Sequence, residues 1–153
     1  MLKAKDIMSQ NPVTVSMETE VGQVAKLLFD KHINGVPVVD AKGKLKGILC
    51  QSDLIAQQKK LSLPSVFTLL DSFIPLKSMK VFEKEVKKMA AATAGDAMTP
   101  NPYTVGLEAT IEDVATLMVE KNFHTIPVVE SGRLVGIIGK EDVLRTLTRG
   151  TDE

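Results

Sequence analysis

The chain has 153 residues, of which 19 are basic and 19 acidic, so its formal net charge is zero. This length supports one compact domain rather than two large independent ones, and a balanced charge gives no long-range attraction to nucleic acid or to an anionic membrane. With no tryptophan and few aromatic residues, the chain also lacks material for a base-stacking surface, so we expect neither of those partners.

The chain has one cysteine, Cys50, which cannot close an intramolecular disulfide. The first residues, MLKAKDIM, lack the apolar segment and cleavage pattern of a secretion signal. No uninterrupted apolar run approaches the roughly 20 residues that a membrane helix needs. We therefore expect a protein of the reducing cytoplasm.

The sequence contains an internal duplication. Residues 6–41 align with residues 96–131 without a gap, and after one deletion residues 43–55 align with 132–144. The identical pairs include Asp6/Asp96, Met8/Met98, Asn11/Asn101, Pro12/Pro102, Val24/Val114, Gly43/Gly132, Gly47/Gly136, Ile48/Ile137 and Asp53/Asp142. Two copies of one structural unit are therefore predicted.

Each repeat opens with an extended segment and continues into a helix. NPVTV at 11–15 and NPYTV at 101–105 are extended because the residue before proline avoids the helical region. Apolar residues then recur at the i, i+3, i+4, i+7 spacing of an amphipathic helix. They are Val21, Val24, Ala25 and Leu28 in the first copy and Ile111, Val114, Ala115 and Met118 in the second. Thr110 and Asp113 predict a capping box in the second copy, whereas Glu20 leaves the first helix start undefined.

A hairpin and a second helix complete each repeat. Val38–Val39 pairs with Leu45–Cys50, and Val128–Val129 with Leu134–Ile138, across glycine-containing turns. Pro37 and Pro127 suit the first residue or the edge of a strand, and Asp53 and Asp142 open the final helices. A unit of about 50 residues buries little surface alone. We therefore predict an α/β (α+β) fold in which two βαββα repeats pack around a pseudo-twofold axis.

The predicted domain boundaries follow from this alignment. Repeat 1 spans residues 1–60, a helical insertion 61–93, repeat 2 94–150 and an acidic, disordered tail 151–153. Helical spacing within the insertion involves Pro64, Val66, Leu69, Leu70 and Phe73, and then Met79, Phe82, Val86 and Met89. Two interpretations of these helices stay open: they cover the core of this chain, or they pack on a second subunit or an effector protein.

The doubled pattern resembles the tandem cystathionine-β-synthase (CBS) domain pair, also called a Bateman module. The similarity rests on a methionine near the start, Asn-Pro, hydrophobic-Pro-Val-Val and Gly-hydrophobic-hydrophobic-x-x-x-Asp, all present twice. It implies two units whose sheets face each other, and clefts between them that bind adenosine-containing ligands. The expected ligands are AMP, ADP or ATP rather than S-adenosylmethionine, with no required cofactor. Homodimerisation and an unidentified effector protein are also implied.

Asp53 and Asp142 are the central candidate residues. A carboxylate has two acceptor oxygens and can accept hydrogen bonds from both the 2′ and 3′ hydroxyls of a ribose. An aspartate in the first turn of a helix is also favoured by capping and by the helix dipole. Recurrence of the aspartate after the same Gly-Ile strand, together with the resemblance, favours ribose binding.

The resemblance also points to a phosphate contact three residues before each aspartate, where the family usually has threonine or serine. This chain has Cys50 and Gly139 there. Ser52, or the backbone N–H of Gly139 at a helix start, would have to compensate. Lys140 and His124 add positive charge to the second repeat, whereas the aligned Gln51 and Asn34 are neutral. We therefore expect unequal sites, in which the Asp142 cleft tolerates phosphates better and the Asp53 cleft is weak or empty.

A base needs a mostly apolar slot with a few polar groups. The candidate lining residues are Val13, Thr14, Val36, Pro37, Val38, Tyr103, Thr104, Ile126, Pro127 and Val128. The apolar members of this set are equally explained as core. Which repeat forms which wall stays open, although mixed sites are expected.

The sequence displays no recognisable catalytic or metal-binding pattern. His32, His124 and Cys50 are too dispersed to indicate a transition-metal site, and we expect Cys50 to be an apolar filler in a strand. No Walker loop, Gly-x-Gly-x-x-Gly motif or serine nucleophile elbow is present. We therefore predict a non-catalytic regulatory module. The alternatives are a structural dimerisation or adaptor domain without ligand and, third, a nucleotide-acting enzyme.

Overall fold

The computed structural model describes residues 1–58, 83 and 92–149. The predicted insertion helices and the acidic tail lie outside this part of the chain, apart from Glu83. The elements of the first half are α1 (Ala4–Ile7), β1 (Ser9–Gln10), α2 (Val21–Lys31), β2 (Gly35–Val39), β3 (Leu45–Cys50) and α3 (Gln51–Gln58). Those of the second half are α6 (Ala94–Ala97), β4 (Thr99–Pro100), α7 (Ile111–Glu120), β5 (Thr125–Glu130), β6 (Arg133–Gly139) and α8 (Lys140–Arg149).

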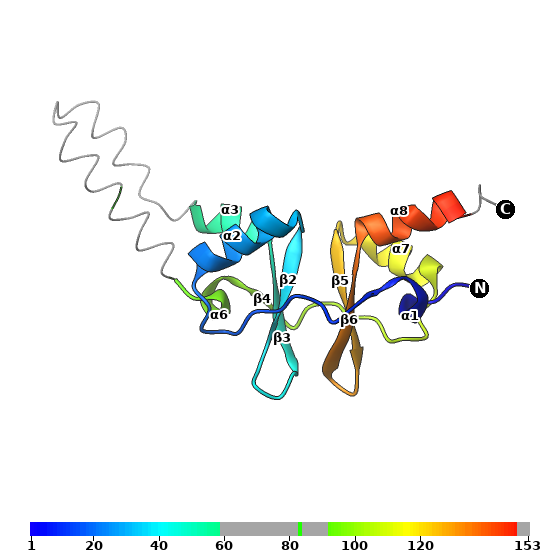
Figure 1. Cartoon of the computed structure of the whole chain (residues 1–153), viewed down its shortest axis with the longest axis horizontal. Helices are drawn as coiled ribbons and strands as arrows, with labels where there is room; N and C mark the ends of the chain where they lie inside the picture. Colours follow the sequence, from blue (N-terminus) through cyan, green and yellow to red (C-terminus); the bar gives the residue numbers. More distant parts are fainter. Residues whose placement is uncertain (59–82, 84–91, 150–153) are drawn as a thin grey trace, which may run out of the picture.

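The described elements form two three-stranded antiparallel sheets. Their strand orders are β2-β3-β4 and β1-β6-β5. The sheets lie side by side in the middle of the module, and the helices cover their outer sides (Figure 1). The predicted mixed fold with two packed repeats is confirmed.

The two repeats exchange their first helix and strand. β1 belongs to the first repeat but pairs with β6, while β4 of the second repeat pairs with β3. The core follows the same exchange, because Ala4 and Ile7 pack with Val114 and Ile138, and Ala94 packs with the core residues of the first hairpin. Each hydrophobic core is therefore built from both repeats.

The hairpins and final helices lie where the sequence predicted them. β2 pairs with β3, and β5 pairs with β6. The register shifts between Val38 and Val39 in the first hairpin and between Val128 and Val129 in the second. The turn residues Gly43 and Gly132 have φ values of +81° and +79°, a conformation that glycine adopts without steric cost. The two turns also contact each other, since Leu45 N donates to Gly132 O and Leu134 N to Gly43 O. The pseudo-symmetric halves are thus tied together at their hairpin tips (Figure 1).

The first strand of each repeat differs from its prediction. The regular strands are Ser9–Gln10 and Thr99–Pro100, just before the predicted segments, and Val15 and Val105 add only isolated parallel bridges to Val38 and Val128. Pro37 and Pro127 stand inside strands rather than at their first residues, but β2 and β5 are edge strands, as the prolines require.

The helix starts also match their sequence signals. In α7 the Thr110 hydroxyl accepts from Asp113 N and the Asp113 carboxylate accepts from Thr110 N, both at 3.1 Å. This confirms the predicted capping box. Glu20, at the N-cap of α2, makes no side-chain capping bond. Among the described residues, no helix is both long and apolar enough to cross a membrane.

Candidate functional site

Asp53 and Asp142 each lie in the first turn of the helix that follows a central strand. Asp53 Oδ2 accepts from the backbone N–H of Cys50 at 2.8 Å, and Asp142 Oδ2 accepts from Gly139 N at 2.8 Å. One oxygen of each carboxylate therefore caps its helix, as the structural interpretation of these residues requires. This cap also fixes the direction of the second oxygen.

The second oxygen has a different partner in each repeat. Asp53 Oδ1 accepts from the hydroxyl of Thr99 at 3.0 Å, and Thr99 lies on β4 of the other repeat. Asp142 Oδ1 accepts from Arg145 Nη1 at 3.1 Å, within α8. Asp142 is the more enclosed partner of that ion pair, with a side chain 13% exposed against 58% for Arg145.

Asp53 borders a cleft of about 570 Å³ whose walls come from both repeats. The first repeat supplies the end of β3 and the start of α3. The second supplies residues 99–103 and the loop before β5. The lining residues are Asn34, Ile48, Cys50, Gln51, Ser52, Asp53, Ile55, Thr99, Pro100, Asn101, Pro102, Tyr103, Asn122, Phe123, His124, Thr125 and Pro127.

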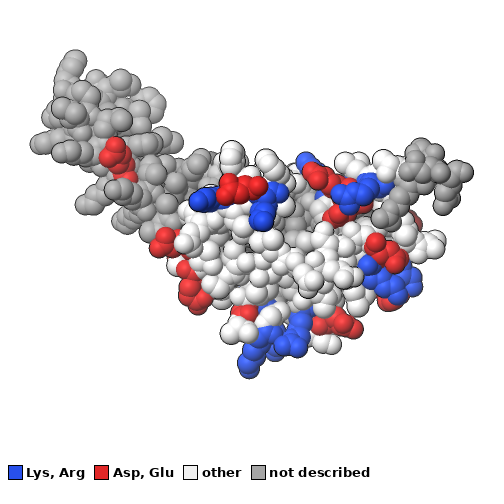
Figure 2. Space-filling model, in the orientation of Figure 1, with Lys and Arg blue, Asp and Glu red and all other residues white. Residues whose placement is uncertain are grey.

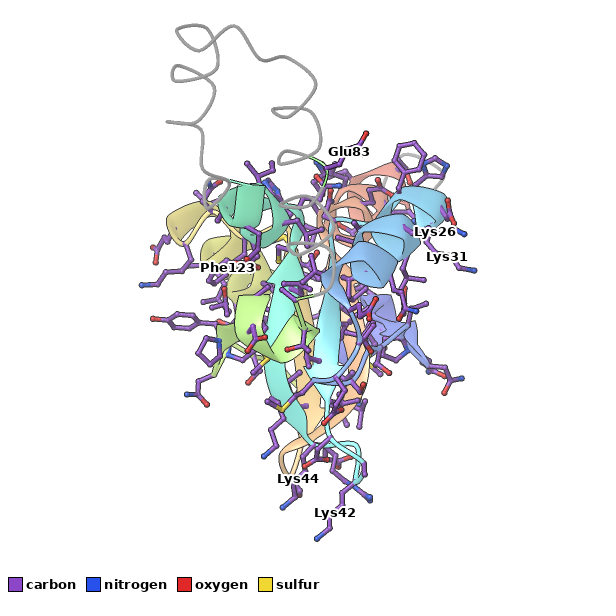
Figure 3. The ribbon with its side chains drawn as sticks, turned by 90° about the vertical axis from the view of Figure 1, so that its left-hand side faces the viewer. Lys26, Lys31, Lys42, Lys44, Glu83 and Phe123 are labelled. Carbon is purple, nitrogen blue, oxygen red and sulfur yellow. The ribbon has the colours of Figure 1, made fainter. Side chains whose placement is uncertain are left out.

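Asp142 borders the pseudo-symmetric cleft, with a volume of about 330 Å³. Equivalent elements form it with the repeats interchanged. Its lining residues are Ser9, Asn11, Pro12, Val13, His32, Ile33, Asn34, Gly35, Thr125, Ile137, Gly139, Lys140, Glu141, Asp142 and Arg145. Figure 3 shows Phe123, of the Asp53 cleft, on the opposite side of the module from Lys31, which precedes His32 of the Asp142 cleft.

The structure brings only part of the predicted set to these clefts. Cys50, Ser52, Asp53, Tyr103, His124 and Pro127 border the first, and Val13, Gly139, Lys140 and Asp142 border the second. The remaining predicted residues, Thr14, Val36, Pro37, Val38, Thr104, Ile126 and Val128, line neither cleft. The four valine and isoleucine members have no exposed surface, because they form the sheet faces against which the helices pack. The core interpretation of those four positions is the one the structure favours.

The assignment of His124 to the Asp142 cleft needs correction. His124 lies in the wall of the Asp53 cleft, together with Tyr103. The exchange of β4 brings Tyr103, in the early segment of the second repeat, into the Asp53 cleft, and the loop before β5 that carries His124 lies beside Tyr103. Only Lys140 of the predicted pair adds charge to the Asp142 cleft.

Three residues of the clefts were not predicted from the sequence. Thr99 carries no pattern of its own and joins the Asp53 cleft through the exchange of β4, while Phe123 joins it from the loop before β5. Arg145 was detectable, since a residue three positions after an aspartate on a helix lies on the same face.

Cys50 is a neutral side chain in this environment. Burial, with a further contribution from the negative charge of Asp53, raises the pKa of its thiol to about 11. Its hydrogen-bonding capacity is therefore that of a weak S–H donor, as expected for an apolar filler at the cleft. Among the described residues, no group of three or more histidine, cysteine, aspartate or glutamate side chains is placed to hold a metal ion.

A fold of two exchanged repeats with an aspartate-bordered cleft on each side defines a tandem repeat module. The family model for the CBS domain matches residues 4–60 and 94–149, so the chain belongs to the CBS domain family and carries two copies of the domain.

Several relatives have similar sequences. An uncharacterized protein of Methanocaldococcus jannaschii is 32% identical over 94% of this chain and 89% of its own length. The chloroplastic CBS domain-containing protein CBSX2 of Arabidopsis thaliana is 32% identical over 89% of this chain. The chain spans 58% of the length of that plant protein.

Solved structures match the fold over nearly its whole length. The crystal structure of CBSX2 in complex with AMP has a TM-score of 0.75 and 27% identity, covering 99% of both chains. The CBS domain pair of protein MJ0100, in complex with 5′-methylthioadenosine and S-adenosyl-L-methionine, has a TM-score of 0.69 and 26% identity, covering 98% of each chain.

Proposed function

We propose that this protein is a non-catalytic regulatory module that binds adenosine-containing ligands in the Asp53 and Asp142 clefts. One observation carries the proposal: each aspartate is held by a helix cap through one oxygen and borders a cleft built from both repeats. Similar CBS pairs have been crystallised with AMP or with 5′-methylthioadenosine and S-adenosyl-L-methionine. Both clefts have volumes within the range of about 300–1,000 Å³ typical of small-molecule sites.

A ribose can replace the present partners of the carboxylates at low cost. In the Asp53 cleft a ligand hydroxyl takes the place of the Thr99 hydroxyl, which exchanges one O–H donor for another. In the Asp142 cleft the partner is Arg145, whose exposed side chain forms an ion pair of the kind worth at most about 1 kcal/mol. Each capping bond stays intact during this exchange.

Occupation of a cleft links the two repeats, because every ligand contacts walls from both. A ligand that prefers one arrangement of the repeats shifts the population toward it by no more than that preference. It also stabilises the folded chain by RT ln(1 + [L]/Kd). Regulation of a partner protein would follow from this shift.

Thermal unfolding with AMP, ATP, 5′-methylthioadenosine and S-adenosylmethionine tests the proposal. We expect the midpoint to rise with at least one of them, and the rise to disappear in a variant carrying both Asp53→Ala and Asp142→Ala. Asp113→Ala is the matched control, because Asp113 caps α7 in the same way and lines neither cleft. A rise that persists in the double variant, or that Asp113→Ala also abolishes, contradicts ribose binding by these carboxylates.

We also propose that the module forms a homodimer through its helices. Phe29 and Val119 occupy equivalent positions on α2 and α7 and are 80% and 81% exposed, and Ile55 and Leu144 form a second exposed equivalent pair. Apolar residues repeated by the pseudo-twofold axis suit the self-complementary contact of a twofold dimer. Light scattering after gel filtration should give a dimer mass, and Phe29→Ser with Val119→Ser should give a monomer. A dimer that binds none of the nucleosides would favour the structural dimerisation domain instead.

A further inference from the structure

The two clefts have equivalent backbones but different charges. Among the described residues, Asp53 is the only acidic residue in its cleft, and no lysine or arginine lines it. The Asp142 cleft contains Lys140 and Arg145 together with Glu141. The distribution of charge, and not the position of the aspartate, distinguishes the two sites.

The two cations of the Asp142 cleft line the same cleft as the carboxylate that we propose binds the ribose. Lys140 is the first residue of α8 and lines the Asp142 cleft, and Arg145 contacts Oδ1 of the Asp142 carboxylate. The equivalent residues of the first repeat are Gln51 and Ala56, which are neutral. A phosphate on the ribose therefore meets two cations in the Asp142 cleft, whereas the equivalent positions at the Asp53 cleft are neutral.

Aromatic side chains and a thiol are part of the wall of the Asp53 cleft. Tyr103 and Phe123 form a tilted pair with ring centroids 5.7 Å apart, and Cys50 presents a half-buried neutral thiol near the carboxylate. The equivalent residues of the other cleft are the smaller Val13 and Ile33. Aromatic rings and a thiol give favourable contacts to a sulfur-containing substituent.

Lys121 contacts an aromatic residue of the Asp53 cleft without lining the cleft itself. Lys121 Nζ stands 5.2 Å from the centroid of the Tyr103 ring, and Lys121 is not among the lining residues. Within the part of the chain that the structure describes, His124 is the only basic residue in the wall.

We propose that the Asp53 cleft takes adenosine derivatives whose 5′ substituent carries no negative charge, such as a nucleoside thioether or sulfonium, and that the Asp142 cleft takes phosphate-bearing nucleotides. This assignment rests on the proposed function, since it requires ribose binding by both aspartates. It extends the expectation of unequal sites by giving the Asp53 cleft a ligand class of its own.

Calorimetric titration at pH 8 with AMP and 5′-methylthioadenosine tests the assignment. Asp142→Ala leaves only the Asp53 cleft, and there we expect the thioether to bind at least ten-fold more tightly than AMP. Asp53→Ala leaves only the Asp142 cleft, where the order should reverse. Adenosine serves as the uncharged reference in both variants.

A transfer of the two cations provides the stricter test. In the Asp142→Ala background, Gln51→Lys with Ala56→Arg should raise the affinity for AMP at least ten-fold and leave that for 5′-methylthioadenosine unchanged. Both positions are exposed on α3, so the substitutions should not disturb the fold. In the Asp53→Ala background, Lys140→Gln with Arg145→Ala should lower the affinity for AMP by a similar factor.

The outcomes separate this inference from the proposed function. Equal affinities of AMP and the thioether in both single-cleft variants, or no effect of the transferred cations, would overturn the assignment while ribose binding stands. Binding of neither compound to the unaltered protein would overturn both.

Discussion

The two repeats share one backbone plan, and their differences lie in side chains at equivalent positions. Both repeats place an aspartate at a helix start, cap the helix at 2.8 Å and border a cleft with it. The residue on the second carboxylate oxygen is threonine in one and arginine in the other. Duplication therefore preserved what the backbone requires, while cleft charge diverged. On the face shown in Figure 2, acidic and basic side chains lie in small mixed groups around a largely uncharged middle.

The glycines of the central strands offer the largest expected contrast in stability. A Cβ at Gly47 would meet the side chain of Met98 and also the backbone oxygen of Thr99, at 2.8 Å. For a Cβ at Gly136 the three nearest atoms all belong to the Met8 side chain, whose flexible end can move. Overpacking costs about 1–3 kcal/mol, so we expect about 3 kcal/mol for Gly47→Ala and about 1 kcal/mol for Gly136→Ala in urea denaturation.

Double variants decide whether this contrast has the stated cause. Met8→Ala should relieve Gly136→Ala, so that the two substitutions together cost less than their separate sum. Met98→Ala should relieve Gly47→Ala only in part, because the Thr99 oxygen stays in place. Equal costs for the two glycines, or full relief in both pairs, would show that the backbone contact does not distinguish the repeats.

Changes at the N-termini of α7 and α2 should have an intermediate effect on the free energy of unfolding. Thr110→Ala removes the cap of α7 and should lower the free energy of unfolding by about 1 kcal/mol. Glu20→Thr should raise it by about 0.5–1 kcal/mol, because Glu20 already has extended backbone angles and Gln23 stands at the third helical position of a new capping box. Thermal unfolding measures both changes. Glu20→Ala is the control, and a gain equal to that of Glu20→Thr would refute the capping explanation.

The smallest expected difference between the repeats is in how the stability contributed by equivalent glutamates, Glu108 and Glu18, depends on acid pH. Hydrogen bonds and charge interactions with Lys3 and Lys5 lower the pKa of Glu108 from 4.5 to about 2, and Lys5 Nζ lies 2.9 Å from its carboxylate. This pKa is depressed on folding, so its stabilisation is present above pH 4.5 and is lost as the pH falls through 2. Among the described residues Glu18, at the equivalent position of the first repeat, has no ion pair.

Unfolding midpoints of Glu108→Gln and Glu18→Gln between pH 6 and pH 2 measure this difference. Glu108→Gln should lower the midpoint slightly at pH 6 and not at pH 2, because the exposed ion pairs stabilise weakly. Glu18→Gln should have no pH-dependent effect. A constant decrease for Glu108→Gln across this range would show that the lost contact is not ionic.

Local patterns in the sequence predicted local structure well. Thr110 with Asp113 predicted the capping box, and Asp53 and Asp142 were placed correctly at helix starts. Both hairpins were also predicted. Each of these features depends on interactions between residues close in the chain, so spacing alone identifies them.

Features that depend on distant partners were not predictable in the same way. The strands Ser9–Gln10 and Thr99–Pro100 have only two residues each, and nothing in them indicates a partner in the other repeat. The position of His124 was assigned wrongly for this reason. Whether Val36 or Val128 lines a slot or the core also depended on which helices cover the sheet faces.

The exchanged strands also constrain how the chain is made. The sheet β1-β6-β5 is complete only when Ser9 pairs with Ile137 of the second repeat. During synthesis residues 9–10 therefore stay unpaired until the second repeat has left the ribosome. Contacts of such long sequence separation slow folding. A nascent chain arrested after the first repeat should hold an incomplete sheet.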